Sequence, residues 1–427
     1  MPRAVQVSEV PGVEEALGTR DPIECARRIR GILGGGADRK DVAGTAALAS
    51  ARHFRPTMPP PHALLALSAA LDLSGRIDPP ELPLVQACAV AAAEWHRERL
   101  PTPAHAVAGD ELHLGRSFQE AVRGPDPMEV DAIFSGLLRE GEERRLAGDT
   151  LFEACAQDTA GEGHKLTFAV GSWRLARSLG WLRGPVLLRP AVRLAASAPQ
   201  ELGEFSTILR EVGRSRLDLE LAGRNVAPID AVARNGWQIA LNAGPDRVVT
   251  ELIAGLKRGR SPSGYADLVA ATAAERLAGD ARALEPVLSA LAVRFVVDFT
   301  RTSARVLAVL QAARAVARLP PADLPEPARI SNPDAGRDDL GDAIGQGDVR
   351  ESTRLARGLA DVLDPEILLH QLRRIAITGD AHEDAGHRLL YTAWASEFAP
   401  VAPGPVLASL AAVLARGPRG EAVFSTF

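Results

Sequence analysis

Residues 120–127 (EAVRGPDP) repeat, in altered form, residues 15–22 (EALGTRDP). Two further copies occur at residues 240–246 (ALNAGPD) and 343–348 (AIGQGD). Each copy predicts a helix end, a turn and a new helix beginning near the aspartate, because an aspartate side chain accepts backbone N–H groups there. The copies recur at intervals of roughly 100–120 residues, which is typical of a duplicated supersecondary unit.

A histidine forms a second landmark, about 40 residues after the aspartate of three copies. These histidines are His62, His164 and His387. In the third copy the equivalent offset reaches Leu284-Glu285-Pro286, so the histidine is missing. A third landmark, proline followed by leucine or valine, predicts the next helix start in the three copies that keep the histidine.

The pattern and the composition together predict an all-α protein. Aromatic residues make up only 4% of the 427 residues, which disfavours a β-sandwich or barrel. We expect four degenerate tandem helical repeats of about 100 residues, each with about four helices, in one elongated or closed assembly. Their expected bounds are residues 1–116, 117–234 with an insertion from 199, 235–330, and 331–427.

Charge and cysteine content narrow the functional classes. The net charge of −5 disfavours binding to nucleic acid or to an anionic membrane. Cys25, Cys88 and Cys155 are scattered, which argues against a disulfide framework or an iron–sulfur cluster. We find neither a signal peptide nor a membrane span, and so expect a cytoplasmic protein.

The repeated histidines are the candidate functional residues. Each lies at a helix start, just after a short stretch with glycine or proline that interrupts the helix. The preceding helix ends in a polar residue, which is His53 before His62, Asp158 before His164 and Asp380 before His387. Imidazoles and carboxylates are ligand types for Fe(II), Mn(II) and Zn(II). If the repeats pack around a common axis, His62, His164 and His387 would meet at a metal site, with those three polar residues as further ligands or orienting groups.

Several alternatives stay open. A repeated histidine can simply cap a helix, and helical-repeat proteins can be scaffolds that do no chemistry. Cofactor-free oxygenation with the histidines as general bases is a third reading. Trp173 and Trp394 follow their histidines closely and could line a substrate pocket. Glu94 is expected on a solvated helix end.

The alanine-rich units with PHAL at residues 61–64, GHKL at 163–166 and GHRL at 386–389 resemble the questin-oxidase-like proteins. They are also similar to the all-helical proteins encoded beside Rieske ferredoxin domains. The resemblance implies oxygen-dependent chemistry on an aromatic or polyketide-like secondary metabolite. We therefore predict a metal-dependent oxygenase, most consistent with iron, that takes a small-molecule substrate and electrons from a separate donor.

Overall fold

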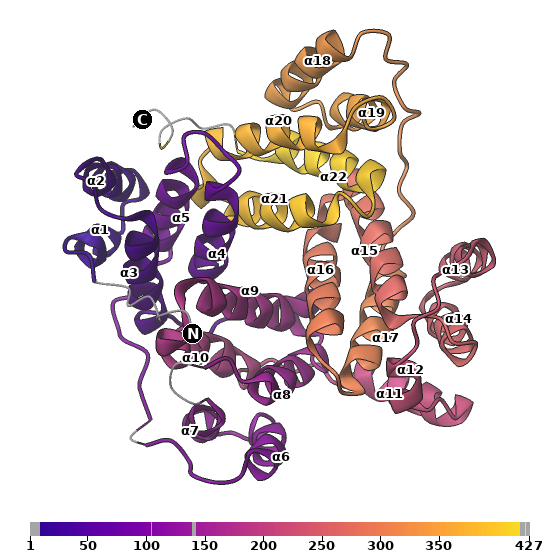
Figure 1. Ribbon diagram of the computed structural model, residues 1–427, viewed down its shortest axis with the longest axis horizontal. Helices are drawn as coiled ribbons and strands as arrows, with labels where there is room; N and C mark the ends of the chain where they lie inside the picture. Colours follow the sequence, from indigo (N-terminus) through magenta and orange to yellow (C-terminus); the bar gives the residue numbers. More distant parts are fainter. Residues whose placement is uncertain (1–8, 104, 139–141, 419–422, 424–427) are drawn as a thin grey trace.

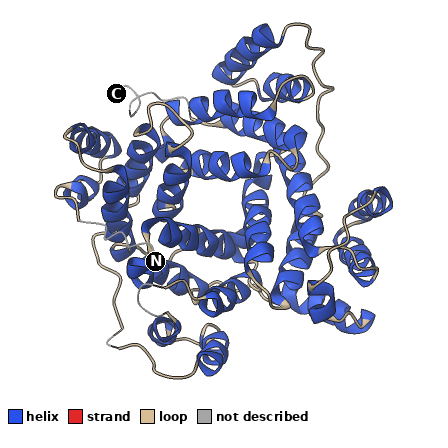
Figure 2. Ribbon diagram, in the orientation of Figure 1, coloured by secondary structure: helices blue, strands red, loops and turns tan. Residues whose placement is uncertain are grey.

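The computed structural model describes residues 9–103, 105–138, 142–418 and 423. Within these residues the chain forms twenty-two α-helices and four short 3₁₀ turns, and no strand beyond one isolated bridge (Figure 2). The prediction of an all-α protein is confirmed. No helix in this part of the chain has the length and apolarity to cross a bilayer.

Four helices form the sides of a square at the centre of the molecule (Figure 1). They are α4 (Ala63–Ser74), α9 (His164–Leu179), α16 (Leu284–Phe299) and α21 (His387–Phe398). Each contacts the next, and α21 contacts α4, so the ring is closed. Most of their residues are buried, as expected for helices that are apolar on nearly every face.

Each ring helix packs against the helix before it and the helix after it in the chain. The preceding helices are α3 (Arg39–Arg52), α8 (Arg145–Ala156), α15 (Pro262–Gly279) and α20 (Pro365–Thr378). The following helices are α5 (Leu82–Ala93), α10 (Gly184–Ala195), α17 (Ala304–Val316) and α22 (Pro403–Arg416). This second layer shields the ring from solvent.

The remaining helices lie at the periphery in Figure 1. They are α1 (Val13–Gly18), α2 (Pro22–Gly34), α6 (Glu111–Ala121), α7 (Pro127–Leu137), α11 (Gly203–Ser215), α12 (Leu219–Gly223), α13 (Ala231–Ala243), α14 (Pro245–Lys257), α18 (Pro333–Gln346) and α19 (Val349–Ala360). The proline-rich stretch at residues 320–330 has no helix, because proline lacks the backbone N–H that a helix interior needs.

The aspartates of the first landmark begin helices in three of four cases. Asp21, Asp126 and Asp348 are N-caps whose carboxylates accept backbone amides of α2, α7 and α19. The third copy differs, because Gly244 occupies the cap position and Asp246 lies inside α14. That aspartate instead forms an ion pair with Arg314 of α17.

Candidate metal centre

His62, His164, Glu285 and His387 meet in the interior. Each offers one ligand atom, and these four atoms all lie within 4.8 Å of one another. The residues come from the starts of the four ring helices: His62 caps α4, His164 and His387 open α9 and α21, and Glu285 is the second residue of α16. We refer to these four residues as the central cluster.

Glu285 was not predicted as a ligand. In the sequence, its position stands out only because the third copy lacks the histidine there. The signal was present, because Glu285 stands at the same offset as the three histidines and carboxylate is itself a metal-ligand type. The structure therefore places a carboxylate on the side of the cluster where the third copy lacks a histidine.

Two close contacts in the central cluster, between His62 and His164 and between His387 and Glu285, have distances that suit ligands of one ion. His62 Nε2 lies 2.9 Å from His164 Nε2. Two nitrogens, each about 2.0–2.1 Å from one metal ion and at right angles, would be about 2.9 Å apart. His164 Nδ1 lies 3.2 Å from one carboxylate oxygen of Glu285, and His387 Nε2 lies 2.8 Å from the other.

Two of these ligand atoms lack a hydrogen-bond partner among the described residues. They are His387 Nε2 and Glu285 Oε2, and both are fully shielded from solvent. His387 Nε2 lies 2.8 Å from the other Glu285 oxygen, in an ion pair that raises the pKa of the histidine. Buried polar atoms without partners are uncommon in folded proteins and call for a specific explanation. A metal ion would satisfy both atoms at once.

The second ring nitrogen of two cluster histidines contacts a backbone carbonyl three residues earlier. His164 Nδ1 lies 3.1 Å from Gly161 O, and His387 Nδ1 lies 2.5 Å from Asp384 O. A proton held on Nδ1 by such an acceptor leaves Nε2 with a free lone pair. Metal-binding histidines are commonly oriented in this way.

The backbone before these two histidines has the same unusual shape. Glu162 and Gly163 have φ of 59° and 92°, and Ala385 and Gly386 have φ of 53° and 79°. Two consecutive left-handed residues, one of them not glycine, cost conformational energy that the surrounding fold must offset. The turn projects the histidine that follows, and it occurs twice.

His62 lies beside a carboxylate from the neighbouring helix. Glu94 caps the C-terminal end of α5, and its Oε2 accepts a hydrogen bond from Ala63 N at 2.7 Å. The other oxygen lies 3.9 Å from His62 Nδ1. The expectation that Glu94 is solvated was wrong: its side chain is only 18% exposed, and burial raises its pKa to about 7.

Electrostatics distinguish the histidines of the cluster. Burial, followed by the charges of His387 and His164, lowers the pKa of His62 well below its usual value. For His387 burial acts in the same direction, but the adjacent Glu285 carboxylate outweighs it and raises the pKa. The cluster therefore keeps His62 neutral, which is the form that binds metals.

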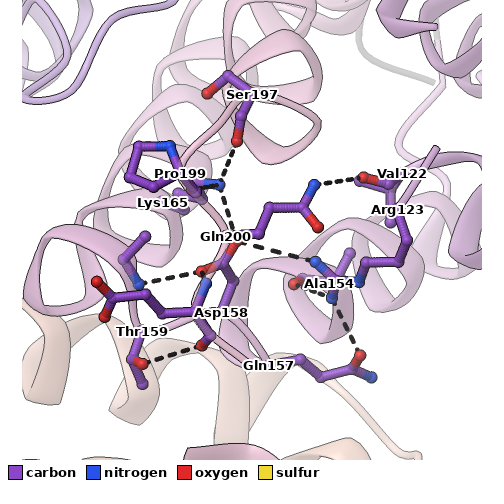
Figure 3. A network of polar contacts seen from close by, with 12 residues as sticks. Val122, Arg123, Ala154, Gln157, Asp158, Thr159, Lys165, Ser197, Pro199 and Gln200 are labelled. Atoms are coloured by element: carbon purple, nitrogen blue, oxygen red, sulfur yellow. Dashed lines mark hydrogen bonds and ion pairs between the residues drawn. The ribbon is translucent and has the colours of Figure 1, made fainter. Parts of the chain in front are cut away.

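Asp158, a further predicted ligand, lies outside the central cluster (Figure 3). One of its oxygens accepts a 2.8 Å bond from Lys165 Nζ, and the other accepts the backbone amides of Ala160 and Glu201. Lys165 also donates to two backbone carbonyls, those of residues 197 and 199. Asp158 is thus occupied as the partner of a buried lysine.

Asp380 and His53 are also outside the central cluster. Asp380 Oδ1 accepts the backbone amide of Val423, and the side chain lies near His382 and Glu383. His53 caps α3, stacks on Trp95 with ring centroids 4.1 Å apart, and its Nδ1 lies 2.8 Å from a carbonyl oxygen. The structure therefore brings none of the three predicted polar partners, Asp158, Asp380 and His53, into the central cluster.

Trp173 and Trp394 pack in the core, and their role in lining a substrate pocket stays a prediction. Trp173 is fully buried against Phe152 and Phe299, and its indole donates to Glu143. Trp394 is 3% exposed, with the Arg174 guanidinium over its ring. Neither lines the cavity of about 870 Å³ between α8, α9, α16 and α17.

Comparisons with protein-family models, curated proteins and solved structures find no match to this chain.

Proposed function

We propose that the central cluster binds one divalent transition metal ion and that the protein is a metal-dependent oxygenase or related oxidoreductase. The observation that supports this most directly is the convergence of three imidazoles and one carboxylate within 4.8 Å, from four distant parts of the chain. A set of nitrogen and oxygen ligands suits Fe(II), Mn(II) or Zn(II). Iron is the ion that we favour, because it fits the oxygen chemistry implied by the resemblance to questin-oxidase-like proteins.

We propose further that the chain consists of four repeats of five helices, rather than the four helices per repeat expected from the sequence. The repeats would be α1–α5, α6–α10, α13–α17 and α18–α22, with α11 and α12 as the insertion. In each, the fourth helix is a ring helix and begins at the ligand position. Duplication around one axis would explain why the same position of every repeat reaches the centre.

When bound, an ion at this position would supply Lewis-acid and redox chemistry that side chains lack. The chain's own residues would orient and protect it. Backbone carbonyls and Glu94 fix the histidine rings from behind, and the two helical layers exclude water. Glu94 is also placed to hold or release a proton beside His62 Nδ1.

We propose an aromatic or polyketide-like small molecule as the substrate and a separate protein or small reductant as the electron donor. Both follow from the resemblance noted in the sequence, and the second also from the spacing of the cysteines. Cys25, Cys88 and Cys155 are all buried and unpaired, which fits a chain without a cluster of its own for electron transfer.

Metal analysis of the purified protein tests the proposal. After anaerobic loading with Fe(II), Mn(II) or Zn(II) and removal of excess ion, we expect about one ion per chain. His164→Ala should lose it, whereas His53→Ala, which removes a buried histidine outside the cluster, should retain it. A chain that takes up no ion, or two variants that bind equally, would contradict the metal site.

Oxygen uptake tests the reaction class. With Fe(II)-loaded protein, a hydroxylated anthraquinone and ascorbate, we expect consumption of dioxygen above the background of the His164→Ala variant. Uptake that depends on the histidines but persists after chelation would instead favour cofactor-free oxygenation. A protein that binds no ion and consumes no dioxygen would favour the scaffold.

A further inference from the structure

The three polar residues that precede the cluster histidines make the same kind of contact. Each lies just after the end of a helix and bonds to a backbone group 43 residues later in the chain. The contacts are His53 Nδ1 to His96 O at 2.8 Å, Glu201 N to Asp158 Oδ1 at 2.9 Å, and Val423 N to Asp380 Oδ1 at 2.8 Å. We refer to them as the outer attachments. Their equal spacing in three separate parts of the chain indicates a common feature of the fold.

The partners of these contacts lie beyond the helix that follows each ring helix. They belong to residues 94–96 after α5, to residues 197–201 after α10, and to the stretch after α22 in which Pro418 and Val423 are described. We refer to these three stretches as the closing segments. Each outer attachment therefore joins a closing segment to the chain just before a ligand histidine.

Each closing segment also bonds to the residue directly after the ligand histidine. Ala63 N donates to Glu94 Oε2 at 2.7 Å, Lys165 Nζ donates to the carbonyls of Ser197 and Pro199 at 2.7 and 3.0 Å, and Arg388 Nη1 donates to the Pro418 carbonyl at 2.8 Å. Figure 3 shows the contacts of Lys165. We refer to these as the inner attachments. The chemical groups differ, but the same two parts of the chain are joined each time.

The attachments around His164 and His387 are shielded from water. Asp158 and Lys165 are each 1% exposed, and Asp380 and Arg388 are each 3% exposed. Water cannot readily replace such a bond, and its loss would leave a buried polar group unpaired. At the end of α15, before Glu285, Asp280 bonds instead to Arg282, only two residues away. Among the described residues, the paired attachments thus accompany the histidines of the cluster.

The two attachments lie on either side of the turn that orients His387. His387 Nδ1 lies 2.5 Å from Asp384 O, and the left-handed residues Ala385 and Gly386 connect the two. Such a turn is energetically unfavourable unless the surrounding structure holds it. The outer attachment holds the chain before the turn, and the inner attachment holds the chain after it.

We infer that Asp158 and Asp380 are positioning residues of the central cluster. Through the closing segments they hold the turns that present His164 and His387, without contacting a bound ion. The effect on metal affinity rests on the proposed function, whereas the attachments themselves do not. All four candidate ligands remain when one attachment is lost, so the result is weaker binding and not the absence of the ion.

Replacement of Asp380 tests the inference. Asp380→Ala removes the outer attachment, whereas Asp380→Asn keeps a carbonyl oxygen that can accept the Val423 amide. Asp364→Ala is the matched control, because its carboxylate also accepts a backbone amide, that of Glu366, but at the other end of α20. We expect Asp380→Ala to bind Zn(II) about tenfold more weakly than the wild type in competition with a dye, the usual effect of losing an orienting partner. The other two variants should match the wild type.

Bound Co(II) reports the geometry of the ligands. We expect its visible spectrum to change in Asp380→Ala and to stay as in the wild type in Asp380→Asn and Asp364→Ala. A loss of stability alone would not produce this change, and thermal melting confirms that each variant folds. Loss of affinity to the same degree in Asp380→Asn would assign the effect to charge and overturn the inference, as would equal affinities of Asp380→Ala and Asp364→Ala.

Hydrogen–deuterium exchange of the metal-free protein tests the attachment without an ion. We expect faster exchange in Asp380→Ala across residues 384–388, with no change across residues 161–165 and none in Asp364→Ala. Unchanged exchange in Asp380→Ala would overturn the inference even if the protein binds metal. Faster exchange in Asp380→Ala, in a protein whose wild type takes up no ion, would support the attachment and defeat the proposed function alone.

Discussion

His62 Nε2 lies 2.9 Å from His164 Nε2, although the two histidines are 102 residues apart in the chain. Each comes from the start of a different ring helix, and both are buried. Two neutral imidazoles can form only one hydrogen bond with each other at this distance. The imidazole of His387 and the carboxylate of Glu285 lie beside them, with all four candidate ligand atoms within 4.8 Å of one another. This contact joins two members of the set of four candidate ligand residues.

Replacement of Glu285 tests that set directly. Glu285→Gln keeps the size of the side chain and removes its charge, so we expect metal affinity to fall by at least about tenfold, with the fold retained. Competition with a metal-binding dye measures the change. Glu275→Gln, on the preceding helix α15 and outside the cluster, serves as the control. Equal affinities of the two variants would remove Glu285 from the ligand set.

Chelation should lower thermal stability if the cluster holds an ion. An ion that binds only the folded chain stabilises it by about 2.7 kcal/mol when its concentration is 100 times Kd. We expect Tm to rise on adding Fe(II) or Zn(II) to the wild type under anaerobic conditions and to fall again with chelator. The His387→Ala variant should show no such shift, and a shift as large as that of the wild type would count against the site.

Glu94→Ala tests the orienting carboxylate behind His62. Loss of such a partner typically costs about 10–100-fold in metal affinity, because the imidazole is then free to rotate. Glu98→Ala, an exposed glutamate four residues later, should have no effect. Isothermal titration with Zn(II) measures both, and unaltered affinity in a folded Glu94→Ala protein would show that the backbone alone positions His62.

Gly163→Ala should destabilise the turn that projects His164. The residue has φ of 92°, and an added Cβ would lie 2.3 Å from Ser289 Oγ, so both the backbone and the packing resist it. We expect a loss of about 1–3 kcal/mol in the free energy of unfolding. Gly404→Ala, at an open position in α22, should change it by less than about 0.5 kcal/mol. Denaturant titration compares them, and similar costs would contradict this account of the turn.

Lys165→Met should be far more destabilising than a typical lysine replacement. The side chains of Lys165 and Asp158 are both fully buried, so removing the lysine leaves the carboxylate with Arg123, at 3.9 Å, as its remaining cation. Such a change costs about 3–5 kcal/mol. Lys257→Met, at the exposed end of α14, provides the comparison. A small cost at Lys165, measured by chemical denaturation, would mean that the network in Figure 3 tolerates an unpaired charge.

The three cysteines should not react with a thiol reagent in the native protein at pH 8. Burial raises the pKa of Cys25 and Cys155 to about 12 and that of Cys88 well above its usual value, so all three remain protonated thiols at that pH. Ellman's reagent should detect none in buffer and all three in guanidinium chloride. Fast reaction of any cysteine in buffer would show that its helix opens readily.

The sequence predicted the helical class and the meeting of three histidines more reliably than the details around them. Helix-start chemistry is local, so Asp21 and Asp126 identified their helices from a few residues. The partners of the histidines are not local. Glu94 approaches His62 from another helix. Asp158 pairs with Lys165, because a buried ammonium group is costly without an opposite charge beside it.

Glu285 illustrates a different limit. A pattern search for histidine treats a carboxylate at the same offset as a gap, although both residues can ligate the same ion. The tryptophans show the reverse error, since closeness in sequence to a histidine did not place Trp173 near it. Nine residues of helix span about 13 Å, so Trp173 lies well along α9 from His164 and away from the central cluster.

The closed ring has a consequence for how the chain comes apart. Its first and last sides, α4 and α21, touch each other, and the four ligand positions are shared among all sides. A bound ion would link residues from the first and last ring helices, so neither helix could dissociate from the ring without losing a metal ligand. A protease cut in the linker at residues 320–330 would leave two pieces that are still joined by the packing of α4 on α21 and of α15 on α22, and a bound ion would add to that association.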